Sequence, residues 1–404
     1  MLAKRKPSVA LLAWLLLAWA APRTGFAQEA SEEDEAVYSV NEAVEAPEDI
    51  QDTQRSKARK DRTWAETVAG TAGAGFDSNV HESPANAKKS AFEYLGVGLE
   101  GLKYFGDAHR LRLDFEADGR RYEEKVRADP YRVEGHAFYG YRPKGKWSAG
   151  TDLSVKHRND SATTIDGELL ARSLAYMSYR QRTSLWLYPT KRQNLELSLT
   201  AQRRDYEETA GIESLDWWKV GTRLEVDHEL SRRVDAEASY SFVDQSYDEE
   251  PSSDSAGVES TTYPAEEHFY HTLDLGFEFE ITPDLEAAIA YEYRRRTDHF
   301  EGFESYSGNG AEADLDWTPG SRWHLVAFAR FQARDYDERP AAGSGTLAWD
   351  RWTAGTSAFF RISKWLSAYV AYDLDWRDTN GSTTSISFRD YERHIVTAGV
   401  SAAR

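Results

Sequence analysis

The chain has 404 residues, no cysteine and a formal net charge of −19 at pH 7. Without cysteine it offers no disulfide, no thiolate metal site and no thiol nucleophile. The excess of acidic residues argues against a nucleic-acid partner, because nucleic-acid phosphates are bound by basic surfaces.

The N-terminal residues have the three parts of a secretory signal peptide. Basic residues at positions 4–6 precede an apolar run over 10–20 and small residues over 25–27. The apolar run is shorter than the roughly 20 residues that a membrane-spanning helix needs. We therefore expect residues 1–27 to be a signal peptide that is cleaved after Ala27.

Residues 28–62 show no strand periodicity. Positions 28–53 are rich in Glu, Asp, Ala and Val, and positions 55–62 are basic. Segments of low hydrophobicity with blocks of like charge do not build a packed core. We predict a disordered or partly helical tail at 28–62, ahead of a folded region at 63–404.

From residue 63 onward, apolar and polar residues alternate in segments of about ten residues. In the segment 109–118, Leu111, Leu113, Phe115 and Ala117 share one face, and Arg, Asp and Glu share the other. Each such strand has one face suited to lipid and one suited to water. The same alternation occurs at 194–202, 234–242, 273–281, 285–293 and 366–376.

The connections between these segments alternate in length. Seven short turns lie near 105–107, 143–145, 188–190, 230–232, 282–284, 318–320 and 362–364. Eight long polar loops lie near 78–90, 121–132, 158–171, 205–216, 245–268, 297–308, 336–348 and 378–391. Together they delimit sixteen strands, with both ends of the chain on the short-turn side.

Short periplasmic turns, long extracellular loops and an even strand number are typical of outer-membrane barrels. Tryptophans also lie next to both kinds of connection, as the two interfacial girdles of such a barrel require. A soluble β-sandwich also alternates, but its strands rarely run so long. We predict an all-β fold, a transmembrane antiparallel β-barrel of about 16 strands (16–18) in the bacterial outer membrane.

The segment Gly75-Phe76-Asp77-Ser78-Asn79-Val80 ends the first expected strand. It resembles the first-strand motif of an outer-membrane β-barrel porin family associated with exopolysaccharide biosynthesis and export. The Arg-rich strand ends with Tyr-Asp or Tyr-Glu resemble the same family, and the resemblance covers Trp64 to the end. It implies a passive conduit for a surface polysaccharide, working with periplasmic and inner-membrane export partners. The tail at 28–62 is then a candidate docking arm for a periplasmic partner.

Charged residues on the polar strand faces are candidates for contact with a passing solute. Acidic residues outnumber basic ones, which disfavours polyanions and favours neutral or cationic solutes. In the alternative interpretation, these charges only keep the lumen wet and linked by salt bridges. The candidates are Asp114, Glu116, Arg223, Glu225, Glu278, Glu292, Arg294, Arg330, Asp373 and Asp375.

A tyrosine flanked by charged residues recurs at the predicted extracellular ends, at Tyr122, Tyr206, Tyr247 and Tyr336. Strand parity points all four rings inward. An aromatic ring beside carboxylates and guanidinium groups suits sugars, because the ring packs on apolar sugar faces while charged groups bond the hydroxyls. If bulges near the loops break the parity, these are ordinary rim residues.

No cofactor or metal motif is present, and the carboxylates at 248–250 do not form a complete cation site. No nucleophile motif indicates an enzyme. The expected partners are outer-membrane lipid and lipopolysaccharide, a polysaccharide cargo and a periplasmic export protein. The alternatives are a diffusion porin for small-solute uptake and a surface-binding structural barrel that uses loops such as 245–268.

Overall fold

The computed structural model describes residues 64–80, 88–123, 129–143, 145–163, 169–207, 215–341, 344–381 and 390–403. The predicted signal peptide (1–27) and tail (28–62) lie outside these residues. No helix within the described ranges is long and apolar enough to cross a membrane.

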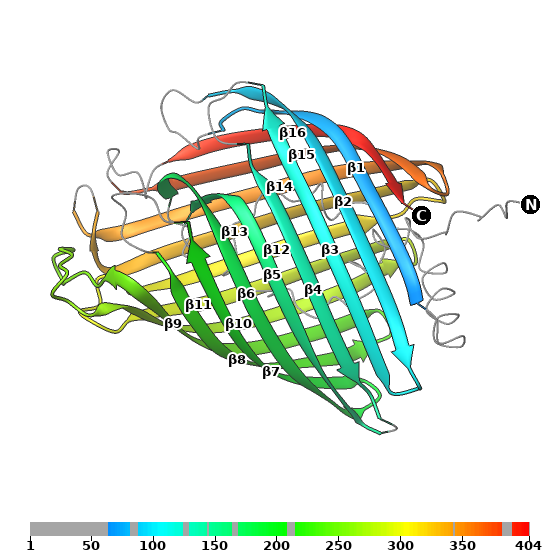
Figure 1. Ribbon diagram of the computed structural model, residues 1–404, viewed down its shortest axis with the longest axis horizontal. Coiled ribbons are helices and arrows are strands. Elements are labelled where there is room, and N and C mark those ends of the chain that lie inside the picture. Colours follow the sequence, from blue (N-terminus) through cyan, green and yellow to red (C-terminus); the bar gives the residue numbers. More distant parts are fainter. Residues whose placement is uncertain are drawn as a thin grey trace, which may run out of the picture.

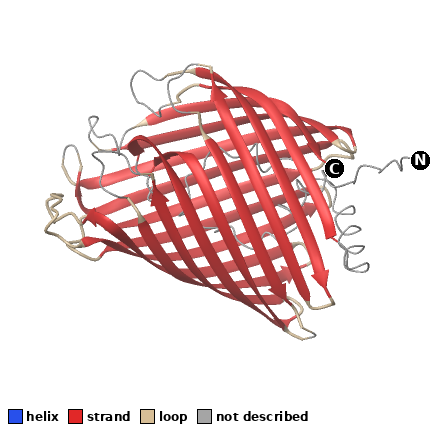
Figure 2. Cartoon of the chain, viewed as in Figure 1, coloured by secondary structure: helices blue, strands red, loops and turns tan. Residues whose placement is uncertain are grey.

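Sixteen antiparallel strands form one closed barrel, and each strand pairs with its neighbours in sequence until β1 pairs with β16 (Figure 1). Figure 2 shows strands running through nearly all of the described chain. The strands are β1 (Trp64–Asp77), β2 (Ser90–Phe105), β3 (His109–Tyr122), β4 (Tyr131–Tyr141), β5 (Trp147–Thr163), β6 (Leu169–Thr190), β7 (Gln193–Tyr206), β8 (Trp217–Ser231), β9 (Val234–Pro251), β10 (Ala265–Thr282), β11 (Leu285–Asp298), β12 (Tyr306–Trp317), β13 (Trp323–Pro340), β14 (Thr346–Ser363), β15 (Leu366–Thr379) and β16 (Tyr391–Ala403).

The alternation of the sequence separates the two faces of the barrel wall. On β10, Leu273 and Leu275 are 41% and 42% exposed, whereas Asp274 between them is 6% exposed. The same contrast recurs around the sheet, so the large apolar side chains lie on the outer face and the polar ones on the inner face. A closed sheet with this polarity is an outer-membrane β-barrel, which confirms the predicted fold and location.

The predicted connections are confirmed in number, with seven turns of 2–5 residues at one end and eight loops of 5–13 residues at the other. Their predicted bounds at the loop end were too wide. The loop predicted at 245–268 spans only 252–264, because β9 and β10 stay paired as far as Pro251 and Ala265. The apolar alternation fades where the strands leave the membrane, although the backbone ladder continues. A spanning strand needs about 9–11 residues, and most of these strands are longer.

The β1–β16 pair closes the sheet. At the loop end of this pair, the residues that carried the family resemblance hold the two strands together. Asp77 has no exposed surface and receives a 2.7 Å hydrogen bond from the Arg393 guanidinium of β16. Asn79 donates its side-chain amide to the backbone carbonyl of Glu392 at 3.0 Å. Tyr122 of β3 donates its hydroxyl to the same Asp77 carboxylate at 3.1 Å. The first-strand motif is therefore part of the closure of the barrel.

Glycines let large rings lie flat against this pair of strands. A Cβ at Gly73 would meet the hydroxyl of Tyr369 at 2.8 Å, and a Cβ at Gly75 would overlap the ring of Phe92. Gly399 on β16 lies under the same Tyr369 ring. Only residues without a Cβ permit so close an approach. On the inner face between β14 and β2, aromatic rings therefore pack on small residues.

We predict that Asp77→Ala lowers the free energy of unfolding by about 3–5 kcal/mol, because it leaves the Arg393 guanidinium buried without its carboxylate. The measurement is urea-induced unfolding of the barrel in vesicles, followed by the change in gel mobility between folded and unfolded protein. Glu392→Gln is the matched control, since Glu392 pairs with His394 on the exposed outer face. An exposed pair of that kind contributes below about 1 kcal/mol, so equal losses for both variants would contradict the prediction.

Candidate pore wall

All fourteen residues proposed for contact with a solute lie on the inner face. The alternation and register of each strand put them on the side opposite the exposed apolar residues. They do not form one compact site but are spread from β3 to β15. Their part in passage stays a prediction, and what the structure adds is the set of partners that each one contacts.

Between β2 and β5 the inner wall is an ion-pair network. Arg112 lies 2.8 Å from Asp114, and Arg132 bridges Glu116 at 3.1 Å and Asp118 at 2.9 Å. Within this group, the two predicted residues Asp114 and Glu116 each have a guanidinium partner from their own or the neighbouring strand. Here the charges link the strands of the wall to one another.

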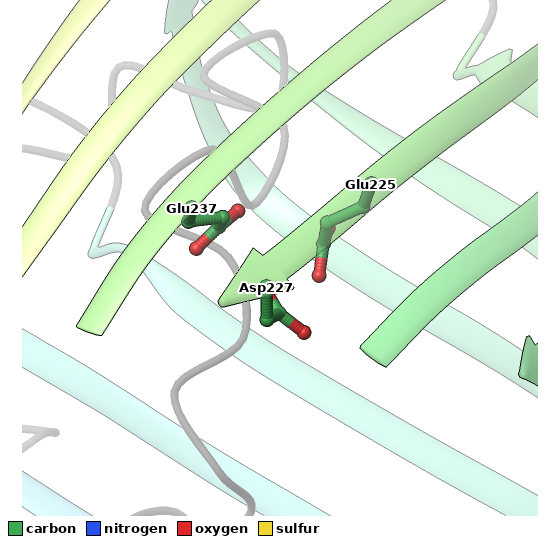
Figure 3. A group of neighbouring side chains, drawn as sticks. All are labelled: Glu225, Asp227 and Glu237. Atoms are coloured by element: carbon green, nitrogen blue, oxygen red, sulfur yellow. The ribbon is translucent and has the colours of Figure 1, made fainter. Parts of the chain in front are cut away.

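On β8 and β9 three carboxylates converge. One oxygen each from Glu225, Asp227 and Glu237 lies within 4.8 Å of the others (Figure 3). Arg223 lies 3.0 Å from Glu225 and 3.3 Å from Glu237, so a guanidinium already balances part of this charge. Of the described residues, these are the ones that could offer a cation several oxygen ligands.

Sequence reasoning had identified Arg223 and Glu225 separately but missed the cluster. The register brings Asp227 opposite Glu237 across the β8–β9 hairpin, and this depends on the two-residue turn between the strands. The available signal was the spacing of acidic residues at alternate positions on both sides of that turn, at Glu225, Asp227, Asp235 and Glu237.

From β10 to β15 most of the predicted residues are held by contacts with other side chains of the inner wall. Arg294 pairs with Glu292 at 3.0 Å and is buried. Asp375 accepts hydrogen bonds from Arg351 at 2.9 Å and from Tyr391 at 3.0 Å. These contacts hold Arg294 and Asp375 against the wall. Of two further predicted residues, Glu278 is half-buried and Asp373 is buried.

Arg330 differs from these residues. Its side chain is 44% exposed although it lies 2.8 Å from Glu312 of the adjacent strand. An exposed guanidinium on the inner face can be reached by a solute. Arg330 is thus the basic candidate best placed for contact.

At the loop end of the barrel, each predicted tyrosine lies opposite an aromatic residue of the neighbouring strand, with both side chains on the inner face. Two of these pairs have ring centroids 5.6 Å apart and one has them 5.5 Å apart. The sequence pattern had shown only one member of each pair, because the other lies on the neighbouring strand and the pairing depends on cross-strand register. The pairs are Phe92–Tyr122, Tyr176–Tyr206, Trp217–Tyr247 and Tyr306–Tyr336.

Arginines join these rings by cation–π contacts. The Arg204 guanidinium lies 4.3 Å from the ring centre of Tyr176 and 4.9 Å from that of Trp217. Arg334 lies 4.1 Å from the ring centre of Tyr306 and 4.5 Å from that of Trp349. Such contacts hold planar groups in register. We call the inward rings of the four pairs, with Arg204 and Arg334, the aromatic collar.

The four collar tyrosines are not equally accessible. Tyr122 and Tyr336 are 5% and 2% exposed, so their rings pack within the wall. Tyr206 and Tyr247 are half-buried and keep part of their surface on the inner side. The hypothesis of sugar contact therefore fits Tyr206 and Tyr247 better than the other two.

The carboxylates at 248–250, predicted to lie in a loop, all lie in strand β9. Asp248 is 2.8 Å from Arg203. In the remaining loop, the backbone N–H groups of Val258 and Ala256 donate to Asp254 and lower the pKa of its carboxyl group. These contacts order the loop between β9 and β10.

No family model matches the chain, and no curated protein matches it. Several solved structures are similar. A bacterial polysaccharide outer-membrane secretin is 10% identical with a TM-score of 0.41, covering 83% of this chain and 97% of its own. An outer-membrane protein of Vibrio cholerae is 10% identical with a TM-score of 0.43, covering 85% and 99%. An anion-selective porin from Comamonas acidovorans is 11% identical with a TM-score of 0.41, covering 85% and 99%.

We predict that Arg223→Ala makes the pore more selective for cations, because it leaves Glu225, Asp227 and Glu237 without the guanidinium that lies between them. The measurement is the reversal potential of the purified barrel in a planar bilayer under a potassium chloride gradient. Arg121→Ala is the control, since it removes the same charge from the outer face. An unchanged reversal potential for the folded Arg223→Ala protein would contradict an electrostatic role for this cluster.

Proposed function

We propose that this barrel is a passive outer-membrane conduit for a secreted surface polysaccharide. The observation that carries the proposal is the inner face itself, a closed wall of fixed hydrogen-bonding groups with an aromatic collar at the loop end. Sugars present hydroxyls and apolar ring faces together, and this wall offers a partner for each. The family resemblance of the first strand supports the same cargo.

The residues best suited to meet the cargo are those that keep exposed surface on the inner face. Tyr206 and Tyr247 would offer ring faces, and Arg330 would offer hydrogen-bond donors. The buried residues of the wall, such as Glu225 and Asp375, act on the cargo through the charge and shape of the lumen. The barrel sets the route, and energy for export comes from its partners.

Deletion of the gene is expected to remove one polymer from the cell surface and the medium, and the full-length protein is expected to restore it. The measurement is the amount and composition of surface and secreted polysaccharide in the deletion strain and the complemented strain. Unchanged polymer, together with slower growth on one nutrient, would instead identify a diffusion porin and overturn export.

The double variant Tyr206→Ala/Tyr247→Ala is expected to lower exported polymer severalfold while the barrel remains folded. Tyr240→Ala is the matched control, because Tyr240 lies on β9, the strand of Tyr247, but on the outer face, where its hydroxyl contacts His271 at 2.7 Å. The folded fraction is checked for each variant by gel mobility. Equal export by the two variants would show that the collar tyrosines do not contact cargo.

The tail at 28–62 is proposed as the docking arm for a periplasmic export partner. A variant lacking these residues is expected to insert into the membrane normally but to fail in restoring the polymer. Full restoration of the polymer by this variant would contradict the role of the tail while leaving the conduit itself intact.

A further inference from the structure

The connections at the two ends of the barrel carry opposite charge. The described residues of the seven short turns include eight basic and two acidic side chains, whereas those of the longer loops include two basic and nine acidic ones. This excess of basic residues occurs in a chain whose net charge is −19. We call the basic turn residues the basic rim: Arg142, Lys146, Lys191, Arg192, Arg232, Arg233, Arg322 and Lys364.

The basic rim lies at the edge of the surface that faces lipid. Lys146, Arg322 and Lys364 are each followed directly by an outward tryptophan, and these tryptophans are 40%, 47% and 53% exposed. Exposed tryptophans mark the level of the lipid headgroups. These three cations therefore lie at the height of the phosphates of the periplasmic leaflet.

Most of these cations have no anionic partner in the protein. The charged groups of Lys191, Arg232, Arg233, Arg322 and Lys364 make no hydrogen bond or ion pair with any described side chain. Arg192 lies 3.9 Å from Glu229, and Arg142 lies over the ring of Tyr188. By contrast, inner-wall cations such as Arg112, Arg132 and Arg223 lie 2.8, 3.1 and 3.0 Å from carboxylates. Several cations of the rim therefore remain available to a ligand.

We propose that the basic rim binds the anionic headgroups of phospholipids in the periplasmic leaflet. A phosphate oxygen accepts hydrogen bonds from guanidinium and ammonium groups, and apolar acyl chains pack beside the neighbouring tryptophans. Basic residues next to a membrane attract anionic lipids in the same way. An anionic cargo could also meet these cations, and Arg142 and Arg192 contact residues of the inner face, but Lys146, Arg322 and Lys364 directly precede tryptophans of the lipid-facing surface. This inference is independent of the cargo.

The test uses the full-length protein, purified in detergent and mixed with phosphatidylcholine and phosphatidylglycerol in equal amounts. Lipid that stays bound is identified by native mass spectrometry. The wild-type protein is expected to retain phosphatidylglycerol severalfold over phosphatidylcholine. The quadruple variant Lys191→Gln/Arg192→Gln/Arg232→Gln/Arg233→Gln is expected to retain the two lipids almost equally. Lys88→Gln/Lys89→Gln, at the loop end, is the control and is expected to match the wild type.

Equal retention of the two lipids by the wild type, or an unchanged preference in the folded quadruple variant, overturns the proposal. So does a variant that keeps its lipid preference but exports less polymer, because the rim would then be an entrance for anionic cargo. If the quadruple variant does not fold, the wild type is measured at rising salt. Loss of phosphatidylglycerol on salt addition supports the proposal, and retention independent of salt contradicts it.

Discussion

The structure depends on closure of the sheet. A strand edge in a bilayer has no water to satisfy its N–H and C=O groups, so sixteen strands are stable only if the first and the last pair with each other. β1 and β16 do so over nine residues, and the buried Asp77–Arg393 pair fixes the outer end of that ladder. The glycines below it allow the rings of Phe92 and Tyr369 to cover the joined strands. The motif that resembles a family thus also has a structural role in closing the barrel.

Closure also determines how the inner wall is organised. Neighbouring strands hold charges opposite one another, so carboxylates and guanidinium groups pair across the ladder, as Arg132 does with Glu116 and Asp118. The same register gives each collar tyrosine an aromatic partner. Most charged side chains of this wall are held by their partners. Arg330 differs from them because its side chain keeps exposed surface.

Period-two alternation was enough to predict the parity of the fourteen candidate residues, and the alternation of short turns and long loops was enough to predict the strand number and the end at which the chain enters and leaves. It works because lipid on one side and water on the other impose opposite demands on successive residues. The loop bounds were predicted poorly, because outside the membrane the demand for apolar residues ends while backbone pairing continues, as in β9 and β10. The carboxylate cluster and the partners of the collar tyrosines depend on cross-strand register, which one strand's sequence does not contain.

The charge difference between the two ends has a consequence for anything that crosses the barrel. The basic rim at one end and the acidic described loop residues at the other contribute a dipole component along the barrel axis. If ions pass through the lumen, this component lowers their electrostatic energy in one direction and raises it in the other, so we expect the conductance to depend on the sign of the applied voltage. A pore with this property is a rectifier.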